Sequence, residues 1–128
     1  MTPNTIYSAF KEMVNSHPHS PAVITDEATV SFLELDRLVN AIVAKIHPAQ
    51  HEFIGIVMHH GLMQIAAMLA VLKSGAAYVP AEPSLPQDRI RYMMHNAGVK
   101  LVITDYLCLN LNPVDEDFPD LSKPDGEA

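Results

Sequence analysis

The chain has 128 residues, 48% of them apolar, which suits one folded domain with a small core rather than two domains. Its formal charge is −7, but residues 113–128 alone carry −5, so the first 112 residues are nearly neutral and offer no basic surface for nucleic acid. The single cysteine, Cys108, excludes an internal disulfide framework and a multi-thiolate metal site. Without a secretory signal or a long apolar run, we expect a cytoplasmic protein that does not enter a membrane.

The first half of the chain predicts helix, strand and helix. Apolar side chains recur at helical spacing over residues 5–15, and residues 22–25 predict the first strand of a sheet. Ser31 and Glu34 have the spacing of a capping box, in which each side chain satisfies a free backbone N–H of the other residue. The helix that they begin continues at helical spacing until Pro48.

A buried strand and an unusually apolar helix follow. Residues 53–58 are apolar throughout, as expected of a central parallel strand. Residues 62–73 predict a helix that is apolar on nearly every side and ends at Gly75. Residues 76–79 predict the next strand, which a loop beginning at Pro80 ends.

The last predicted elements complete an alternating series. Ser84 and Gln87 again have capping-box spacing and predict a helix, and residues 99–104 predict a final strand. Alternating strands and helices indicate an α/β fold, namely a three-layer, mostly parallel sheet with helices on both faces. We therefore expect an α/β domain at residues 1–106 and an acidic, proline-containing tail or linker at residues 107–128.

Two segments resemble core motifs of amino-acid adenylation domains. Residues 30–36 (Val-Ser-Phe-Leu-Glu-Leu-Asp) are similar to the first motif, usually Leu-Thr-Tyr-x-Glu-Leu-Asn. Residues 72–80 (Leu-Lys-Ser-Gly-Ala-Ala-Tyr-Val-Pro) resemble the second, and Pro83 and Pro86 continue its pattern. Their order and spacing resemble the adenylate-forming (AMP-binding) superfamily, and the two-proline version is typical of nonribosomal peptide synthetases.

The resemblance implies the first subdomain of a larger enzyme. In the complete enzymes of the family, an amino acid and ATP, with magnesium, give an aminoacyl-adenylate and pyrophosphate, and a carrier-protein thiol then takes the aminoacyl group. The family's phosphate loop, adenine and magnesium motif, ribose-binding Asp and catalytic Lys all lie further downstream. No functional residue of the family can therefore be carried onto this chain.

The glycines agree with that expectation. No two of the five glycines lie within five residues of each other, so no loop is expected to cradle phosphates with clustered backbone N–H groups. The five are Gly55, Gly61, Gly75, Gly98 and Gly126. We assign no catalytic, cofactor-binding or metal-binding residue in this chain, and we expect ATP and magnesium only in the complete family enzyme.

Histidines are the most prominent alternative site. His59 and His60, with Gly61, replace the Arg-Ser or Arg-Thr that usually follows the central strand, and they lie where ligands often bind in open α/β sheets. Neighbours on a strand point to opposite faces, so we expect a loop or interface role rather than a shared metal. His47 and His51 flank a turn, and we expect them to be exposed to solvent.

Other polar and sulfur-containing residues also have structural interpretations. Ala81 and Glu82 replace the family's usual branched residue and Asp, and we expect Glu82 to pair with Arg89 and brace the proline loop rather than contact substrate. Cys108 has no evident activating base, so we expect an unreactive thiol. We expect the methionines to fill the core, and the acidic tail to be a solvated end rather than a docking segment.

The predicted function is that of an N-terminal fragment of an adenylation domain, a scaffold that is inactive alone and whose partner is the rest of the domain or a synthetase subunit. The alternative is a stand-alone interaction or oligomerisation module, because the apolar helix at residues 62–72 leaves apolar surface exposed. A self-sufficient small ligase would need the missing phosphate site, and a nonfunctional remnant is the remaining alternative. The activated amino acid cannot be read from this chain.

Overall fold

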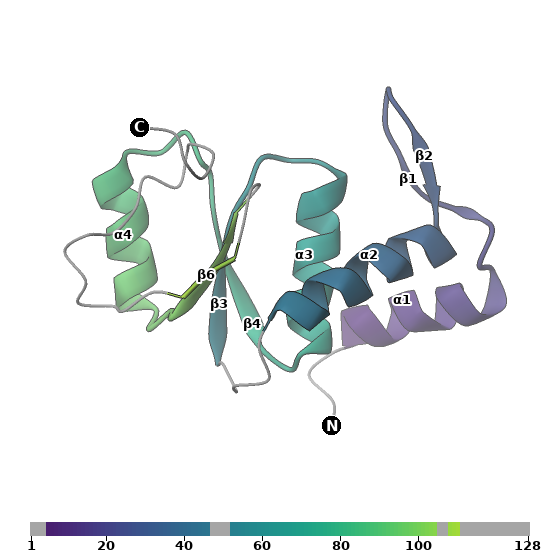
Figure 1. Ribbon diagram of the computed structural model, residues 1–128, viewed down its shortest axis with the longest axis horizontal. Coiled ribbons are helices and arrows are strands. Elements are labelled where there is room, and N and C mark those ends of the chain that lie inside the picture. Colours follow the sequence, from purple (N-terminus) through teal and green to yellow (C-terminus); the bar gives the residue numbers. More distant parts are fainter. Residues whose placement is uncertain (1–4, 47–51, 105–107, 111–128) are drawn as a thin grey trace. The chain divides into compact units, whose positions relative to one another are not determined.

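The computed structural model describes residues 5–46, 52–104 and 108–110 (Figure 1). The chain divides into two compact units, each built from two segments of sequence. The first unit comprises Met1–Pro48 and His60–Gly75, and the second comprises Ala49–His59 and Ala76–Ala128. None of the described helices combines the length and the apolar character that crossing a membrane would require.

The first unit contains three helices and a β-hairpin. Its elements are α1 (Thr5–Ser16), β1 (Pro21–Ile24), β2 (Thr29–Ser31), α2 (Phe32–Lys45) and α3 (Leu62–Lys73). The helix α2 packs against both α1 and α3, and α1 also contacts α3. Figure 1 shows the hairpin projecting beyond the helices of this unit.

The hairpin corrects one prediction. The segment expected to be the first strand of the parallel sheet is β1, and it pairs antiparallel with β2 in a separate two-stranded sheet. A tight turn makes this local pairing possible, because the Thr25 hydroxyl donates to the Ala28 carbonyl at 3.1 Å and accepts from the amides of Glu27 and Ala28. A parallel partner would instead require a long crossover connection, which this short turn does not supply.

The helices of the first unit agree with the sequence pattern in part. Phe10 and Val14 of α1 are buried, as expected of its apolar face, but Ile6 is 64% exposed. The helix α3 has the predicted bounds, and Gly75 ends it in the left-handed region with φ 91°.

The second unit is a four-stranded sheet with one helix. Its elements are β3 (Phe53–Val57), β4 (Ala77–Ala81), α4 (Gln87–Asn96), β5 (Leu101–Thr104) and β6 (Cys108–Asn110). The strand order is β4-β3-β5-β6; β3 is parallel to β4 and to β5, whereas β6 is antiparallel to β5. The fold is therefore the mixed α/β fold with a parallel sheet and helices that the sequence predicted.

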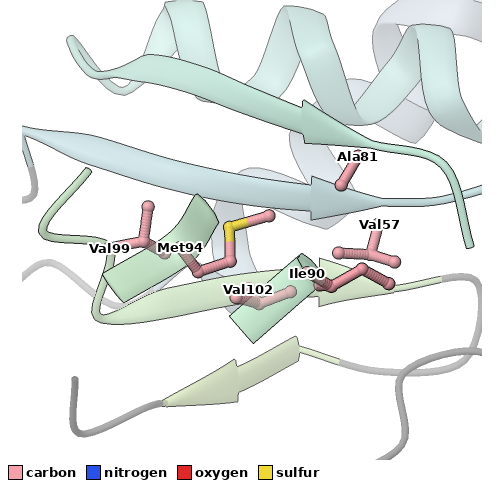
Figure 2. Close-up of a cluster of buried hydrophobic side chains, with 6 residues drawn as sticks. All are labelled: Val57, Ala81, Ile90, Met94, Val99 and Val102. Atoms are coloured by element: carbon pink, nitrogen blue, oxygen red, sulfur yellow. The ribbon is translucent and has the colours of Figure 1, made fainter. Parts of the chain in front are cut away.

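A compact apolar cluster joins α4 to the sheet of the second unit. Figure 2 shows side chains from α4 directed at side chains from three strands; the cluster consists of Val57, Ala81, Ile90, Met94, Val99 and Val102. Gly55 lies within the same layer, and a Cβ atom added there would come within 2.6 Å of Met94 Sδ and 3.0 Å of a Val102 methyl group. A larger residue at this position would therefore require the Met94 side chain or α4 itself to shift.

The start of α4 in the second unit differs from the sequence prediction. The capping box expected at Ser84 is absent: α4 begins at Gln87, and its N-cap is Pro86, without a side-chain hydrogen bond. A helix capped by Ser84 would need a helical Leu85 directly before Pro86, and a proline disfavours that conformation in the preceding residue. The amides of Arg89 and the next residue instead bond to the Pro86 carbonyl.

The two ends of the sheet also differ from expectation. The strand β4 does not stop before Pro80 but continues through it to Ala81, in register with β3. The strand β6 lies in the segment expected to be tail or linker, and its Cys108 pairs with Ile103 of β5. The other residues after Thr104 lie outside the described part of the chain.

Candidate functional site

Three of the glycines in the described part of the chain occupy structural positions. Gly55 lies in β3 against α4, while Gly75 and Gly98 end α3 and α4 with positive φ angles of 91° and 73°. The Gly75 amide bonds to the Leu72 carbonyl at 3.1 Å, and the Gly98 amide is similarly bonded within its own helix end. These contacts account for the three glycines as packing and helix-end residues, and the absence of a nucleotide site stays a prediction.

The histidine pair begins two residues after the end of β3. His59 and His60 are both exposed, and the ring Nδ1 of His60 is 3.2 Å from Oε1 of Gln64, one turn into α3. Within the described ranges there is no group of three or more His, Cys, Asp or Glu side chains placed to hold a metal ion. His47 and His51 lie outside the described residues.

The predicted pairing of Glu82 with Arg89 stays a prediction. An ion pair within α4 joins Arg91 to Asp88 at 3.3 Å. Asp88 and Arg91 are three residues apart on the same helix, so the two side chains meet without any help from the loop.

The sulfur-containing residues are only partly described. The backbone of Cys108 lies in β6, and its side chain is outside the described part, so its expected inertness stays a prediction. Of the methionines expected to fill the core, Met58 and Met94 are buried, whereas Met63 is 45% exposed.

The first core motif is a helix start. The hydroxyl of Ser31 accepts from the Glu34 amide at 3.1 Å, and the Ser31 amide donates to Glu34 Oε1 at 2.9 Å, so the predicted capping box is confirmed. The hydrogen bond from the Ser31 backbone, then that from its side chain, and then the nearby Arg37 charge lower the pKa of Glu34 below its usual value. The carboxylate that results also complements the positive end of α2.

The same motif contributes a buried acid that the sequence analysis missed. Asp36 is 7% exposed, and its Oδ2 lies 3.6 Å from Nζ of Lys11 on α1. Asp36 occupies the position where the family motif usually has Asn, three residues before the buried Val39. This spacing of three residues places Asp36 and Val39 on the same packed face of α2. It was the signal in the sequence that could have predicted the burial of Asp36.

The second core motif reaches back to the first two helices. Lys73, at the end of α3, donates to Asn40 Oδ1 on α2 at 2.5 Å, and its ammonium lies 5.7 Å from the ring centroid of Tyr7 on α1. The Tyr7 ring in turn contacts Phe10, and Phe10 contacts Phe32 of the first motif, at centroid distances of 6.0 and 6.1 Å. The Lys73 ammonium therefore links all three helices of the first unit.

The described site is thus a structural one. Both segments that resemble core motifs begin, end or join helices in the first unit, and the second also enters β4 of the second unit. The chemistry available from these contacts is hydrogen bonding and charge pairing that hold helices in place.

Comparison with known proteins identifies the family. Residues 10–127 match the family described as AMP-binding enzyme. The chain is 30% identical over 129 residues to tyrocidine synthase 2 of Brevibacillus parabrevis, covering 97% of this chain and 4% of that protein. It is 37% identical over 98 residues to surfactin synthase subunit 3 of Bacillus subtilis, covering 74% of this chain and 8% of that protein. The chain therefore spans less than a tenth of the length of either relative.

Solved structures share the fold. The chain resembles an artificially fused adenylation–PCP di-domain, NpsA-ThdA from Klebsiella oxytoca, with a TM-score of 0.72 and 24% identity, over 78% of this chain and 20% of that one. It resembles the N-terminal subdomain of NpsA from the same organism with a TM-score of 0.71 and 24% identity, over 78% of this chain and 27% of that one. The chain belongs to the AMP-binding enzyme family, and its homologues are the adenylation domains of peptide synthetases.

Proposed function

We propose that this chain is the structural beginning of an amino-acid-activating adenylation domain and is catalytically silent by itself. The observation that carries the proposal is the use of both core motifs for packing: Ser31 caps α2, and Lys73 joins α3 to α2 and α1. A segment whose most family-like residues hold helices together supplies scaffold rather than reacting groups. The activity of the complete domain would be the ATP-dependent formation of an aminoacyl-adenylate.

The partner in this proposal is the remainder of an adenylation domain. The relatives that match are many times longer than this chain, and the similar solved structures continue well beyond the matched part. ATP and magnesium would be bound by residues of that remainder. We place the protein in the cytoplasm, because ATP and free amino acids are available there.

An exchange assay tests the proposal directly. The purified chain is assayed for amino-acid-dependent ATP–pyrophosphate exchange alone, and then after mixing with a polypeptide that carries the rest of an adenylation domain. We expect no exchange from the chain alone and exchange from the mixture. A Val39→Asp variant is the matched control, because a charge at this fully buried position of α2 disrupts the scaffold and leaves every other residue intact.

Two results would overturn this account. Exchange by the chain alone would show that it contains a complete active site. Magnesium-dependent ATP binding by the chain alone, measured calorimetrically, would show that it holds the nucleotide site assigned to the remainder.

The second candidate function is an interaction or oligomerisation module. The observation that favours it is apolar side chains exposed in the first unit: Ile6 of α1 is 64% exposed, and Met63 and Ile65 of α3 are 45% and 37% exposed. Size-exclusion chromatography with light scattering distinguishes the candidates. A monomer at high concentration argues against the module, whereas a defined oligomer that a Met63→Lys and Ile65→Glu double variant dissociates would support it.

A further inference from the structure

The strand β4 is an end strand of the described sheet. It pairs with β3 in parallel from Phe53 opposite Ala77 to Val57 opposite Ala81, and no other described strand lies on its far side. Figure 2 shows β4 at one end of the four strands. An end strand presents unpaired N–H and C=O groups, which are a template for pairing with another chain.

The direction of each β4 backbone group follows from one hydrogen bond. The Ala77 amide donates to the Glu52 carbonyl at 3.0 Å, so the backbone groups of Ala77 face β3. In a strand the N–H and C=O of one residue point to the same side, and successive residues alternate. Val79 and Ala81 therefore also face β3, while Tyr78 and Pro80 face away from it, toward what we call the outer edge of β4.

Pro80 removes a donor from this outer edge. Proline has no N–H, so within β4 the outer edge has one amide, that of Tyr78, and the next outward-facing position has only a carbonyl. Prolines in sheets are found where the missing N–H would face solvent, which explains how β4 continues through Pro80 without losing a bond to β3. The Pro80 side chain is exposed, so its ring is not required to fill the core.

We propose that Pro80 closes the outer edge of β4 against strand addition, and that the partner it excludes is the same edge of a second copy of this chain. A copy that paired with β4 could bond to the Tyr78 amide and would then meet the proline ring two residues further on. The ladder would end there, because the ring occupies the place of the donor that the next bond requires. A proline in the second core motif thus protects the sheet from pairing with itself.

Amide hydrogen exchange on the wild-type chain, followed by NMR, tests the geometry. We expect the amides of Ala77, Val79 and Ala81 to exchange slowly and the Tyr78 amide to exchange rapidly, because only Tyr78 faces outward. A Tyr78 amide that is protected like that of Val79 in a dilute sample would overturn the proposal, because the edge would already be paired.

A pair of variants tests the function of the proline. Pro80→Val restores the amide and favours a strand, and Pro80→Lys restores the amide but adds a charge that repels a second copy. We expect Pro80→Val to self-associate at concentrations at least about fivefold lower than the wild type, the factor that one net hydrogen bond supplies. Sedimentation velocity measures this, and we expect Pro80→Lys to behave like the wild type.

Each outcome decides the proposal. Protection of the Tyr78 amide that rises with the concentration of Pro80→Val would locate the new contact at the outer edge. A folded Pro80→Val chain that sediments like the wild type at every concentration would overturn the proposal. Circular dichroism shows whether Pro80→Val folds. If it does not, Pro80→Ala replaces it in the sedimentation test, with the same outcomes for and against the proposal, and the wild-type exchange pattern still tests the geometry.

Discussion

Lys11 Nζ lies 3.6 Å from Asp36 Oδ2, an ion pair that joins α1 to α2 in the first unit. The other oxygen, Asp36 Oδ1, is buried and has no hydrogen-bond partner among the described residues. A buried carboxylate with one oxygen left unpaired is costly, and within the described part of the chain Lys11 is the cation that offsets this cost. The family motif usually has Asn at this position, and a neutral amide does not need that cation.

The two partners of this pair should therefore respond differently to substitution. We expect Lys11→Met to lower the free energy of unfolding by about 1–2 kcal/mol, a moderate value because the Lys11 side chain is 43% exposed and its charge is screened. We expect Asp36→Asn to change it by less than about 0.5 kcal/mol, since the charge and its desolvation are removed together. Urea denaturation measures both values.

The double variant is the control for that prediction. In the Asp36→Asn background, Lys11→Met should have little effect, because no buried charge remains to be stranded. If Lys11→Met lowers the free energy of unfolding equally in the wild type and in Asp36→Asn, the lysine stabilises the helices through its aliphatic chain and not through its charge.

The Lys73 contacts predict a second loss of stability. Lys73→Met removes the hydrogen bond to Asn40 and the contact with the Tyr7 ring, and we expect it to lower the free energy of unfolding by about 1–2 kcal/mol. Lys100→Met, at an exposed lysine before β5, is the matched control and should change it by less than about 0.5 kcal/mol. Equal effects at the two positions would contradict a linking role for Lys73.

Gly55 should not tolerate a larger side chain. A Cβ atom at this position would lie 2.6 Å from Met94 Sδ, so Gly55→Ala must displace α4 or Met94, at a cost of about 1–3 kcal/mol. Thermal unfolding monitored by circular dichroism measures this cost. Combining Gly55→Ala with Met94→Ala should be less destabilising than the sum of the two single changes, because the shortened side chain makes room for the new methyl group. Strict additivity would argue that the two residues are not in contact.

The capping box predicts a pH dependence. Hydrogen bonds from Ser31 lower the pKa of Glu34 in the folded chain, so the ionised carboxylate stabilises the folded state above the pKa of the unfolded chain, and this contribution is lost as pH falls through the lower, folded value. The stability difference between wild type and Glu34→Gln should therefore be present at neutral pH and vanish in acid. Denaturation curves across this range measure it, and a difference that does not change with pH would contradict the assignment.

Replacing the cap residue Ser31 should lower the free energy of unfolding in a way that depends less on pH than replacing Glu34 does. Ser31→Ala leaves the Glu34 amide without its acceptor, and we expect a loss of about 1 kcal/mol at neutral pH. Ser31→Asp should restore most of that stability, since Asp caps helices as well as Ser does. Chemical denaturation of the three chains tests this order.

Local chemistry made much of the first unit predictable. The capping box at Ser31 depends on two side chains within one helical turn, and the helix at residues 62–73 ends next to Gly75, which adopts a positive φ. The same rule was wrong at Ser84, where the adjacent Pro86 opposes a helical Leu85. A spacing pattern therefore predicts a helix start only where the intervening residues can also adopt the helical conformation.

Contacts between residues that are far apart in the sequence could not be predicted from the sequence pattern. Lys73 and Asn40 are 33 residues apart, and nothing in the periodicity of either helix indicates that they meet. Burial of Asp36 depends on where α1 packs, and the direction of the Pro80 carbonyl depends on the register between β4 and β3.

The sequence by itself determined the family, the α/β class and the alternation of helices with the strands β3, β4 and β5, because these depend on motifs and on periodicity along the chain. Only the tertiary structure decided that β1 pairs with β2, that β4 runs through Pro80, and that Lys11 and Lys73 join the helices of the first unit. The physical reason is that strand register and charge pairing are set by which surfaces meet in space, and short-range patterns do not specify those surfaces.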